Sequence, residues 1–250
     1  MSYIGSSSKM VKERYIQKYS CWRKNRKITR ENPEIWVLKS SNIAYIQIPK
    51  VASRSIRQCL AKSYVETENL EPPRKWDKES IRTIENKTAF HASHKKINHL
   101  TKNYFVFSFV RNPYSRVYSA YKNKVMQPLE RTNKNIFLNH GISLGMDLDK
   151  FVDIICAIPD HKIDRHLRSQ SWFLTFQGQL IPNYIGRLES FEKDWKTLSN
   201  DFELPKAEIK NSTQYTGYRD LSKNFSLEAK EKIRARYHKD FLLFNYSDEL

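Results

Sequence analysis

The sequence predicts an α/β fold in which helices flank a central, mainly parallel sheet in three layers. Two apolar segments, 43–48 and 105–110, have the length and the near-continuous hydrophobicity of strands buried on both faces. Each of them runs directly into a segment with helical character. Alternation of strands and helices is typical of parallel sheets covered by helices, so α/β is the class that this chain favours.

The first third of the chain is predicted to hold two strands, a helix and a polar excursion. Residues 35–38 and 43–48 flank a turn at 40–42 and are expected to be adjacent strands. A helix is predicted over 53–64. The polar segment 66–89 contains two consecutive prolines and is predicted to be an excursion on the surface.

The remainder of the chain is predicted to be mostly helical after the strand at 105–110. The helix that follows this strand is expected to end near Val125. Residues 127–147 are rich in Asn and Gly and are predicted to be a loop, whose length suggests a role in covering a substrate. Further helices are predicted at 147–158, 190–200 and 226–238, the last with Ser226 as its N-cap.

Basic residues strongly outnumber acidic residues. Lys and Arg total 44 against 27 Asp and Glu, which gives a formal net charge of +17 for 250 residues. This charge predicts an anionic partner, and nucleic acid, a membrane surface and an acidic glycan all satisfy it. The length predicts a single domain at 31–250, preceded at 1–30 by a basic arm suited to peripheral contact with a membrane or an anionic acceptor.

The turn after the strand at 43–48 has the features of a phosphate site. Residues 48–56 read Ile-Pro-Lys-Val-Ala-Ser-Arg-Ser-Ile, so Lys50 stands between a buried strand and the start of a helix. Unpaired N–H groups and the helix dipole attract anions at such a point. The stretch contains no glycine and lacks the Walker pattern, which disfavours an ordinary ATP or GTP loop.

A second strand end carries the same kind of sequence. The strand at 105–110 is followed by Arg111, a proline turn and a helix. Since ligands in open α/β sheets bind at the carboxyl ends of the strands, Lys50 and Arg111 are expected to face one ligand with separated anionic groups. A doubly phosphorylated nucleotide fits that description.

These two segments resemble the sulfotransferases that use 3′-phosphoadenosine 5′-phosphosulfate (PAPS), specifically the branch that sulfates carbohydrates. Three further stretches, 164–170, 185–195 and 237–246, are similar to the same branch, so the resemblance runs from about residue 35 to the C-terminus. It implies a P-loop-like form of the three-layer fold and a carbohydrate acceptor. The positive charge is compatible with an anionic one.

The resemblance also implies how the donor is bound. In that family the first loop holds the 5′-phosphosulfate, and the second loop binds the 3′-phosphate through its arginine and a later serine. Carried over to this chain, the donor-binding residues are Lys50, Val51, Ala52, Ser53, Arg54, Ser55, Arg111 and Ser119. Arg54 departs from the threonine or serine that is commoner in the family. No metal is expected, because no His, Cys and Asp cluster has metal-ligand spacing.

Sulfuryl transfer needs a cation and a base. Lys50 is predicted to neutralise the charge that builds on the leaving oxygen, by analogy with phosphoryl transfer. A base with a pKa near neutrality favours histidine, and the chain has 7. His91 lies between the two loops, where several carbohydrate sulfotransferases place their base, and is the first candidate. His94 is the alternative, and His166 belongs to a segment similar to a family stretch near the acceptor cleft.

Two other functions compete with this prediction. A nucleotide or small-molecule kinase shares the phosphate chemistry, but it would need a glycine-rich loop and a magnesium-binding carboxylate at a strand end. A nucleic-acid-binding module fits the charge, but no helix-turn-helix, finger or RNP signature supports specific binding. The sequence does not identify the acceptor.

The sequence predicts a cytoplasmic, bacterial enzyme. The 3 cysteines are widely spaced and form no C-x-x-C pair, which favours a reducing compartment. The sequence shows no apolar run of membrane-spanning length and no signal-peptide core at its beginning. Animal members of the resembled branch, in contrast, usually carry an N-terminal membrane anchor.

Overall fold

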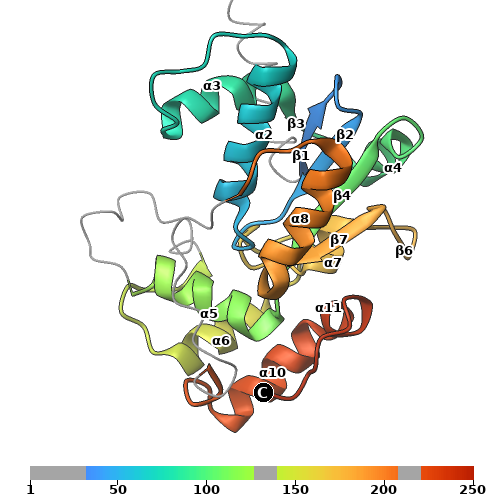
Figure 1. Cartoon of the computed structure of the whole chain (residues 1–250). Coiled ribbons are helices and arrows are strands. Elements are labelled where there is room, and N and C mark those ends of the chain that lie inside the picture. The colour runs from blue at the N-terminus through green and yellow to red at the C-terminus, as the bar shows by residue number, and fades with distance from the viewer. Residues whose placement is uncertain (1–31, 127–139, 208–220) are drawn as a thin grey trace, which may run out of the picture.

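The computed structural model describes residues 32–126, 140–207 and 221–250 (Figure 1). The predicted basic arm at 1–30 lies outside the described residues, as does most of the predicted loop at 127–147. Within the described ranges the chain alternates strands and helices.

A five-stranded sheet forms the centre of the molecule. Its strands, in spatial order, are β3 (Ala89–His91), β1 (Glu34–Leu38), β2 (Ile43–Gln47), β4 (Phe105–Val110) and β7 (Tyr184–Arg187). β2 pairs in parallel with β4, and β4 with β7, whereas β1 is antiparallel to both of its neighbours. Every strand except β1 therefore runs in the same direction. This confirms an α/β fold with a mostly parallel sheet and the predicted adjacency of the first two strands.

Helices connect and flank these strands. They are α2 (Ser53–Thr67), α3 (Lys78–Thr88), α4 (His94–Leu100), α5 (Pro113–Lys124), α6 (Leu148–Ala157), α7 (Gln170–Leu174), α8 (Phe191–Phe202), α10 (Leu227–Arg236) and α11 (His238–Leu243), with a 3₁₀ turn η3 (Leu188–Ser190). A small hairpin pairs β5 (Thr175–Phe176) with β6 (Gln179–Leu180). The predicted helices are present with shifted ends, and Ser226 caps α10 by accepting from the Ala229 N–H at 3.1 Å.

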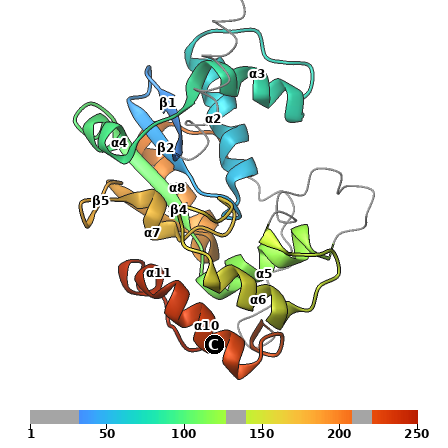
Figure 2. The same ribbon diagram turned by 180° about the vertical axis from the view of Figure 1, so that it is seen from behind.

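The helices cover both faces of the sheet. α8 lies in front of the sheet in Figure 1, and α7 lies in front of it in the reverse view of Figure 2. α5, α6 and α10 gather below the sheet in both views. They enclose a second buried cluster, which includes Tyr114, Phe151 and Tyr237, separate from the cluster around the strands that includes Trp36 and Phe107.

The segment 66–89 differs from its prediction as a surface excursion. It contains helix α3 and the edge strand β3. Asp77 caps α3 by accepting from the Ser80 N–H at 2.9 Å, and Ile81 and Ile84 are its two buried apolar side chains. Such a sparse apolar stripe is a weak helical signal. β3 is only three residues long and is defined by its pairing with β1, which no local pattern reveals.

Parallel pairing brings the ends of β2, β4 and β7 to one edge of the sheet. The segments that follow these strands are the loop 48–52 before α2, residues 111–112 before α5, and η3 before α8. Ligand sites of open α/β sheets lie at this edge, so the fold places the two predicted phosphate loops side by side.

We predict that Gly186→Ala destabilises the core of the sheet. Gly186 stands opposite Phe109 in the β4–β7 pairing, and a Cβ there would lie 2.5 Å from Cε1 of that ring. The ring is buried against Phe191 and Trp195, so it has little room to move. The free energy of unfolding in urea should fall by about 1–3 kcal/mol, the usual cost of overpacking.

The double variant Gly186→Ala with Phe109→Leu tests the cause. A smaller side chain opposite the new methyl group removes the clash. The double variant should therefore lose clearly less stability than the sum of the losses in the two single variants. Additive losses would show that the clash with the ring is not the reason for the destabilisation.

Candidate active site

The loop between β2 and α2 has an unusual backbone. Lys50 and Ala52 both have left-handed conformations, with φ of 74° and 58°, which residues other than glycine rarely adopt. Ala52 is also the N-cap of α2 and provides no side-chain hydrogen bond to the first turn. The N-terminus of α2 therefore lacks the capping oxygen that Ser, Thr, Asn or Asp supplies, which suits it to an external anion.

The other predicted residues of this loop have different surroundings. The Val51 side chain is buried in the core around the sheet, so only its backbone is placed to serve a ligand. Ser55 is buried in the first turn of α2, Ser53 is half-buried and Arg54 is exposed. The buried Val51 side chain therefore anchors the loop, and the polar groups of the loop lie on either side of Val51 along the chain.

The arginine after β4 reaches the first loop. Arg111 donates from Nη1 to the Lys50 carbonyl at 3.4 Å and from Nε to Ser115 Oγ at 2.8 Å. The Gln170 side chain clasps its backbone: Oε1 accepts from the Arg111 N–H at 2.9 Å, and Nε2 donates to the Arg111 carbonyl at 2.7 Å. The two loops that the sequence placed around one ligand are thus in direct contact.

Ser119 lies in the next turn of α5 after Ser115. Residues four apart lie on the same face of a helix, so Ser119 shares the face of Ser115, which accepts a hydrogen bond from Arg111. Its side chain is buried. The start of α5 is held in place by Glu189, whose carboxylate accepts from the Asn112 N–H at 2.8 Å and from the Tyr246 hydroxyl at 2.9 Å.

Positive charge dominates the surroundings of Lys50. Burial lowers the pKa of its ammonium to about 7. Repulsion contributes to this lowering, and the cations responsible are Lys124, Arg111, Arg54 and Arg116. Several cations converging on one buried ammonium form a site that an anion with separated charged groups would stabilise.

Arg116 fastens the first loop to the rest of the site. Its side chain is 2% exposed, and its guanidinium donates from Nε to the Pro49 carbonyl at 3.2 Å and from Nη1 to the Arg168 carbonyl at 2.6 Å. Burial lowers the pKa of Arg116, and the carboxylates of Asp240 and Asp160 partly offset this effect. One side chain of α5 therefore fixes both the residue before Lys50 and the segment that precedes α7.

The two histidines first predicted as the base form hydrogen bonds with backbone carbonyls. His91 ends the edge strand β3, which β1 separates from β2, and its Nδ1 lies 3.0 Å from the Asn32 carbonyl. His94 Nε2 lies 2.6 Å from the Trp172 carbonyl, so this nitrogen carries a proton and donates it. Burial lowers the pKa of His94 against the effect of that hydrogen bond.

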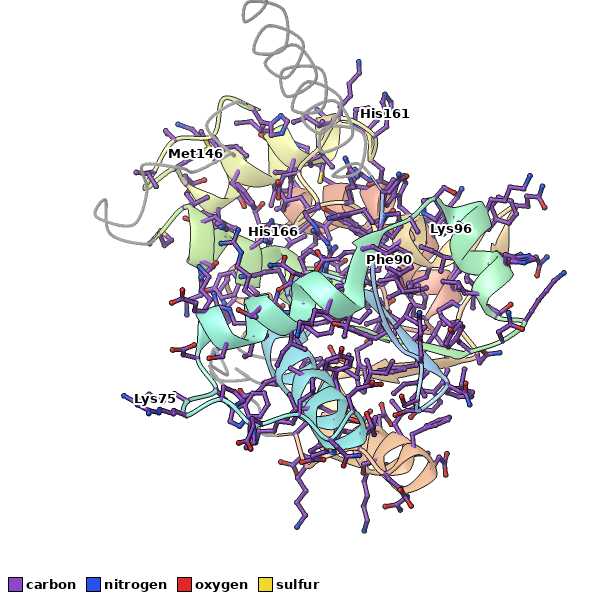
Figure 3. The ribbon with its side chains drawn as sticks, turned by 90° about the horizontal axis from the view of Figure 1, so that it is seen from above. Lys75, Phe90, Lys96, Met146, His161 and His166 are labelled. Carbon is purple, nitrogen blue, oxygen red and sulfur yellow. The ribbon has the colours of Figure 1, made fainter. Side chains whose placement is uncertain are left out.

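The third candidate, His166, lies nearer the cations of the donor site. Its Nδ1 lies 2.6 Å from Asp164 Oδ1, and the ring interacts electrostatically with Lys124 and Lys50. Figure 3 shows His166 well inside the outline of the molecule, whereas Phe90, the neighbour of His91, and Lys96 lie farther toward α4. The Asp-x-His spacing was visible in the sequence, but its approach to Lys50 depends on tertiary folding.

The structure also bears on metals and membranes. In the part of the chain that the structure describes, no three His, Cys, Asp or Glu side chains are grouped so that they could hold a metal ion. None of the helices in residues 32–126, 140–207 and 221–250 combines the length and the hydropathy that crossing a bilayer requires.

We predict that Arg116→Lys lowers stability although it keeps the charge. Lysine cannot reach both carbonyls, and a hydrogen bond to a charged group contributes about 1.5–3 kcal/mol. The free energy of unfolding in urea should fall by about 2–4 kcal/mol. The exposed Arg82→Lys on α3 is the matched control and should stay within about 0.5 kcal/mol of the parent protein. Equal stability of the two variants would contradict the anchoring role.

Comparison with known proteins identifies the family of this chain. The model of the sulfotransferase family matches residues 33–247. Carbohydrate sulfotransferase 11 of Mus musculus and of Rattus norvegicus are each 26% identical to this chain over 190 residues, covering 64% of the chain and 52% of the relative. The chain thus spans about half the length of the curated relatives it matches, and no solved structure matches it. On the strength of the family match, the chain belongs to the sulfotransferase family.

Proposed function

We propose that this protein transfers a sulfuryl group from PAPS to a hydroxyl of a carbohydrate acceptor. The observation that carries the proposal is the contact between two cationic loops at the carboxyl edge of the sheet, where Arg111 Nη1 donates to the Lys50 carbonyl at 3.4 Å. A donor with phosphate groups at two positions on its ribose matches two such loops. Membership of the sulfotransferase family supports the same donor.

In this proposal the loop after β2 acts as a P-loop-like cradle for the 5′-phosphosulfate. Residues 50–55 supply the Lys50 ammonium and the N-terminus of α2, which has no side-chain cap. Arg111, which precedes α5, and Ser119, which lies within it, bind the 3′-phosphate. A planar guanidinium suits this role because it donates two parallel hydrogen bonds to a phosphate.

Lys50 is proposed to act on the reaction as well as on binding. As the bond between sulfur and the 5′-phosphate breaks, negative charge builds on the phosphate oxygen, and a buried ammonium beside it stabilises that charge. A base must take the proton of the attacking hydroxyl. The sequence predicts His91 or His94 for it, and neither assignment has been tested.

The proposed acceptor is a carbohydrate. Both curated relatives carry the name carbohydrate sulfotransferase, and the net charge of +17 favours an anionic glycan over a neutral one. A kinase remains the second candidate for the phosphate chemistry, but residues 48–56 lack the glycines that such a loop uses.

Two further proposals concern the whole chain. Residues 31–250 form a single catalytic domain, and the protein works in a bacterial cytoplasm. Fractionation of the source cells, with the protein followed by antibody, tests the location: recovery with the membrane fraction after washing in high salt would contradict it.

We predict that 3′-phosphoadenosine 5′-phosphate (PAP), the product of the donor, stabilises the protein. At 100 times its dissociation constant a ligand adds about 2.7 kcal/mol, which for a domain of this size raises the melting temperature by about 5–10 °C. ATP with magnesium should raise it much less. Equal shifts with the two nucleotides would contradict the sulfotransferase proposal.

Arg111 variants test the site of the 3′-phosphate in the same measurement. Arg111→Ala should lose most of the shift, and Arg111→Lys should recover only part of it because lysine lacks the planar fork. Arg82→Ala, which changes an exposed arginine of α3, is the matched control and should keep the full shift. An unchanged PAP affinity in Arg111→Ala would show that this arginine has a structural role only.

We predict that PAP binding takes up a proton at pH 8. With its pKa lowered to about 7, Lys50 is mostly neutral at pH 8, and an anion bound beside it raises the pKa and returns the proton. Calorimetric titrations in buffers of different ionisation enthalpy should show uptake approaching one proton at pH 8. Affinity should accordingly fall as the pH rises above 7.

The matched variant is Lys50→Arg, because arginine stays protonated throughout this range. It should bind PAP without the proton uptake at pH 8. Uptake that persists in Lys50→Arg would assign the titrating group to another side chain.

A further inference from the structure

We propose that His166 is the general base that deprotonates the acceptor hydroxyl and that Asp164 is its positioning residue. The proposal rests on the proposed sulfuryl transfer, whose donor site it adjoins. It replaces the assignments of His91 and His94, which the sequence places in this role through a family resemblance.

The contacts of Asp164 determine how the imidazole is protonated. Its Oδ1 accepts from the His166 backbone N–H at 2.9 Å and from Nδ1 of the same residue at 2.6 Å. With the proton held on Nδ1, a neutral ring carries its lone pair on Nε2. This is the arrangement by which a carboxylate orients a catalytic histidine in acyl transfer.

The charges around the ring favour its neutral form. Burial lowers the pKa of His166, the carboxylate of Asp164 opposes that effect, and Lys124 and Lys50 lower the pKa further. Although burial alone would raise it, hydrogen bonds from His166 hold the pKa of Asp164 below its ordinary value. The pair therefore combines a fixed carboxylate with an imidazole that stays unprotonated at neutral pH.

The segment 160–169 that carries this pair is fixed to the fold at three points. Arg165 Nη1 donates to Glu34 Oε2 on β1 at 2.9 Å. The Arg168 carbonyl accepts from Arg116, which also holds the residue before Lys50. At the start of the segment, Arg236 Nη2 on α10 donates to Asp160 Oδ1 at 2.7 Å. A base must be held rigidly relative to its substrate, and these contacts provide that for His166.

His91 and His94 are less suited than His166 to act as the base. The lone pair needed for a base cannot lie on His94 Nε2, which donates to the Trp172 carbonyl. His91 lies at the end of the edge strand, on the far side of β1 from β2. Of His94 and His166, the residue whose pKa Lys50 lowers is His166.

The proposed step transfers one sulfuryl group and one proton. The acceptor oxygen forms a bond to sulfur while its proton passes to His166 Nε2. The bond between sulfur and the 5′-phosphate oxygen of PAPS breaks, and its electron pair stays on that oxygen, beside Lys50. The products are a sulfate ester, PAP and an imidazolium, which returns its proton to water.

Kinetics with labelled PAPS test the assignment, using a panel of methyl glycosides and uronic-acid oligosaccharides and taking the sugar that the parent protein sulfates fastest. His166→Ala should lower kcat by about 10²–10⁴-fold, the usual loss for a general base, while PAP still raises its melting temperature. His161→Ala is the matched control, since His161 lies exposed in the same segment and at the outer edge of Figure 3. A residual rate above about a tenth of the parent rate in His166→Ala would overturn the proposal.

The pH profile separates a base from a merely structural histidine. Activity should rise with pH as His166 loses its proton. Asp164→Asn removes a charge that raises the pKa of His166, so the acid limb should move to lower pH and kcat should fall. Lys124→Met removes a charge that lowers this pKa, so the limb should move to higher pH. Acid limbs that stay in place in Asp164→Asn and Lys124→Met would contradict the assignment. An acid limb that shifts in His91→Ala would contradict it as well.

A measurement without an acceptor covers the case in which no sugar of the panel reacts. In protein labelled with ¹⁵N in its histidine rings and saturated with PAP, the signals lost in His166→Ala identify this residue. A neutral ring at pH 7 with its proton on Nδ1 supports the proposal, and a protonated ring or a proton on Nε2 overturns it. Failure of the parent protein to bind PAP would contradict the donor proposal instead.

Discussion

The hydrogen bonds of one buried guanidinium hold the site together. Arg116 lies in α5 and binds the carbonyls of Pro49 and Arg168, so the loop after β2, the helix after β4 and the segment before α7 share a single anchor. A buried charge destabilises the folded protein unless hydrogen bonds satisfy it, so removing one of its partners would lower stability. The anchor therefore also fixes the distance between the donor loop and the segment that carries His166.

This arrangement concentrates positive charge around Lys50. Lys50 is surrounded by Arg111, Lys124 and other cations, and its own backbone is held in a left-handed conformation. Both features raise the free energy of the protein by itself, and a bound polyanion would offset the repulsion. Strain and repulsion of this kind are typical of functional sites, and a ligand that relieves the repulsion binds more tightly.

The sequence predicts the donor half of this site better than the acceptor half. The strand ends before Lys50 and Arg111 are local features: an apolar run, a turn and a helix start, each readable over a dozen residues. Nothing local shows that 89–91 is an edge strand, since β3 exists only through its pairing with β1. The electrostatic interaction of His166 with Lys50 likewise depends on contacts between distant residues, Arg165 with Glu34 and Arg116 with Arg168. The family resemblance predicts His91 as the base from its position along the chain.

The charges of two lysines act on the proposed base, His166, with opposite consequences before and after the donor binds. Lys50 and Lys124 make His166 less basic, which reduces the driving force for taking a proton. The donor, however, brings several negative charges into the same site, and these would raise the pKa of an isolated histidine until it was protonated and inactive. The lysines offset that effect, and Asp164 restores enough basicity for proton transfer. The cations that bind the donor thus also keep the proposed base in its working form, which links the two halves of the reaction through one electrostatic balance.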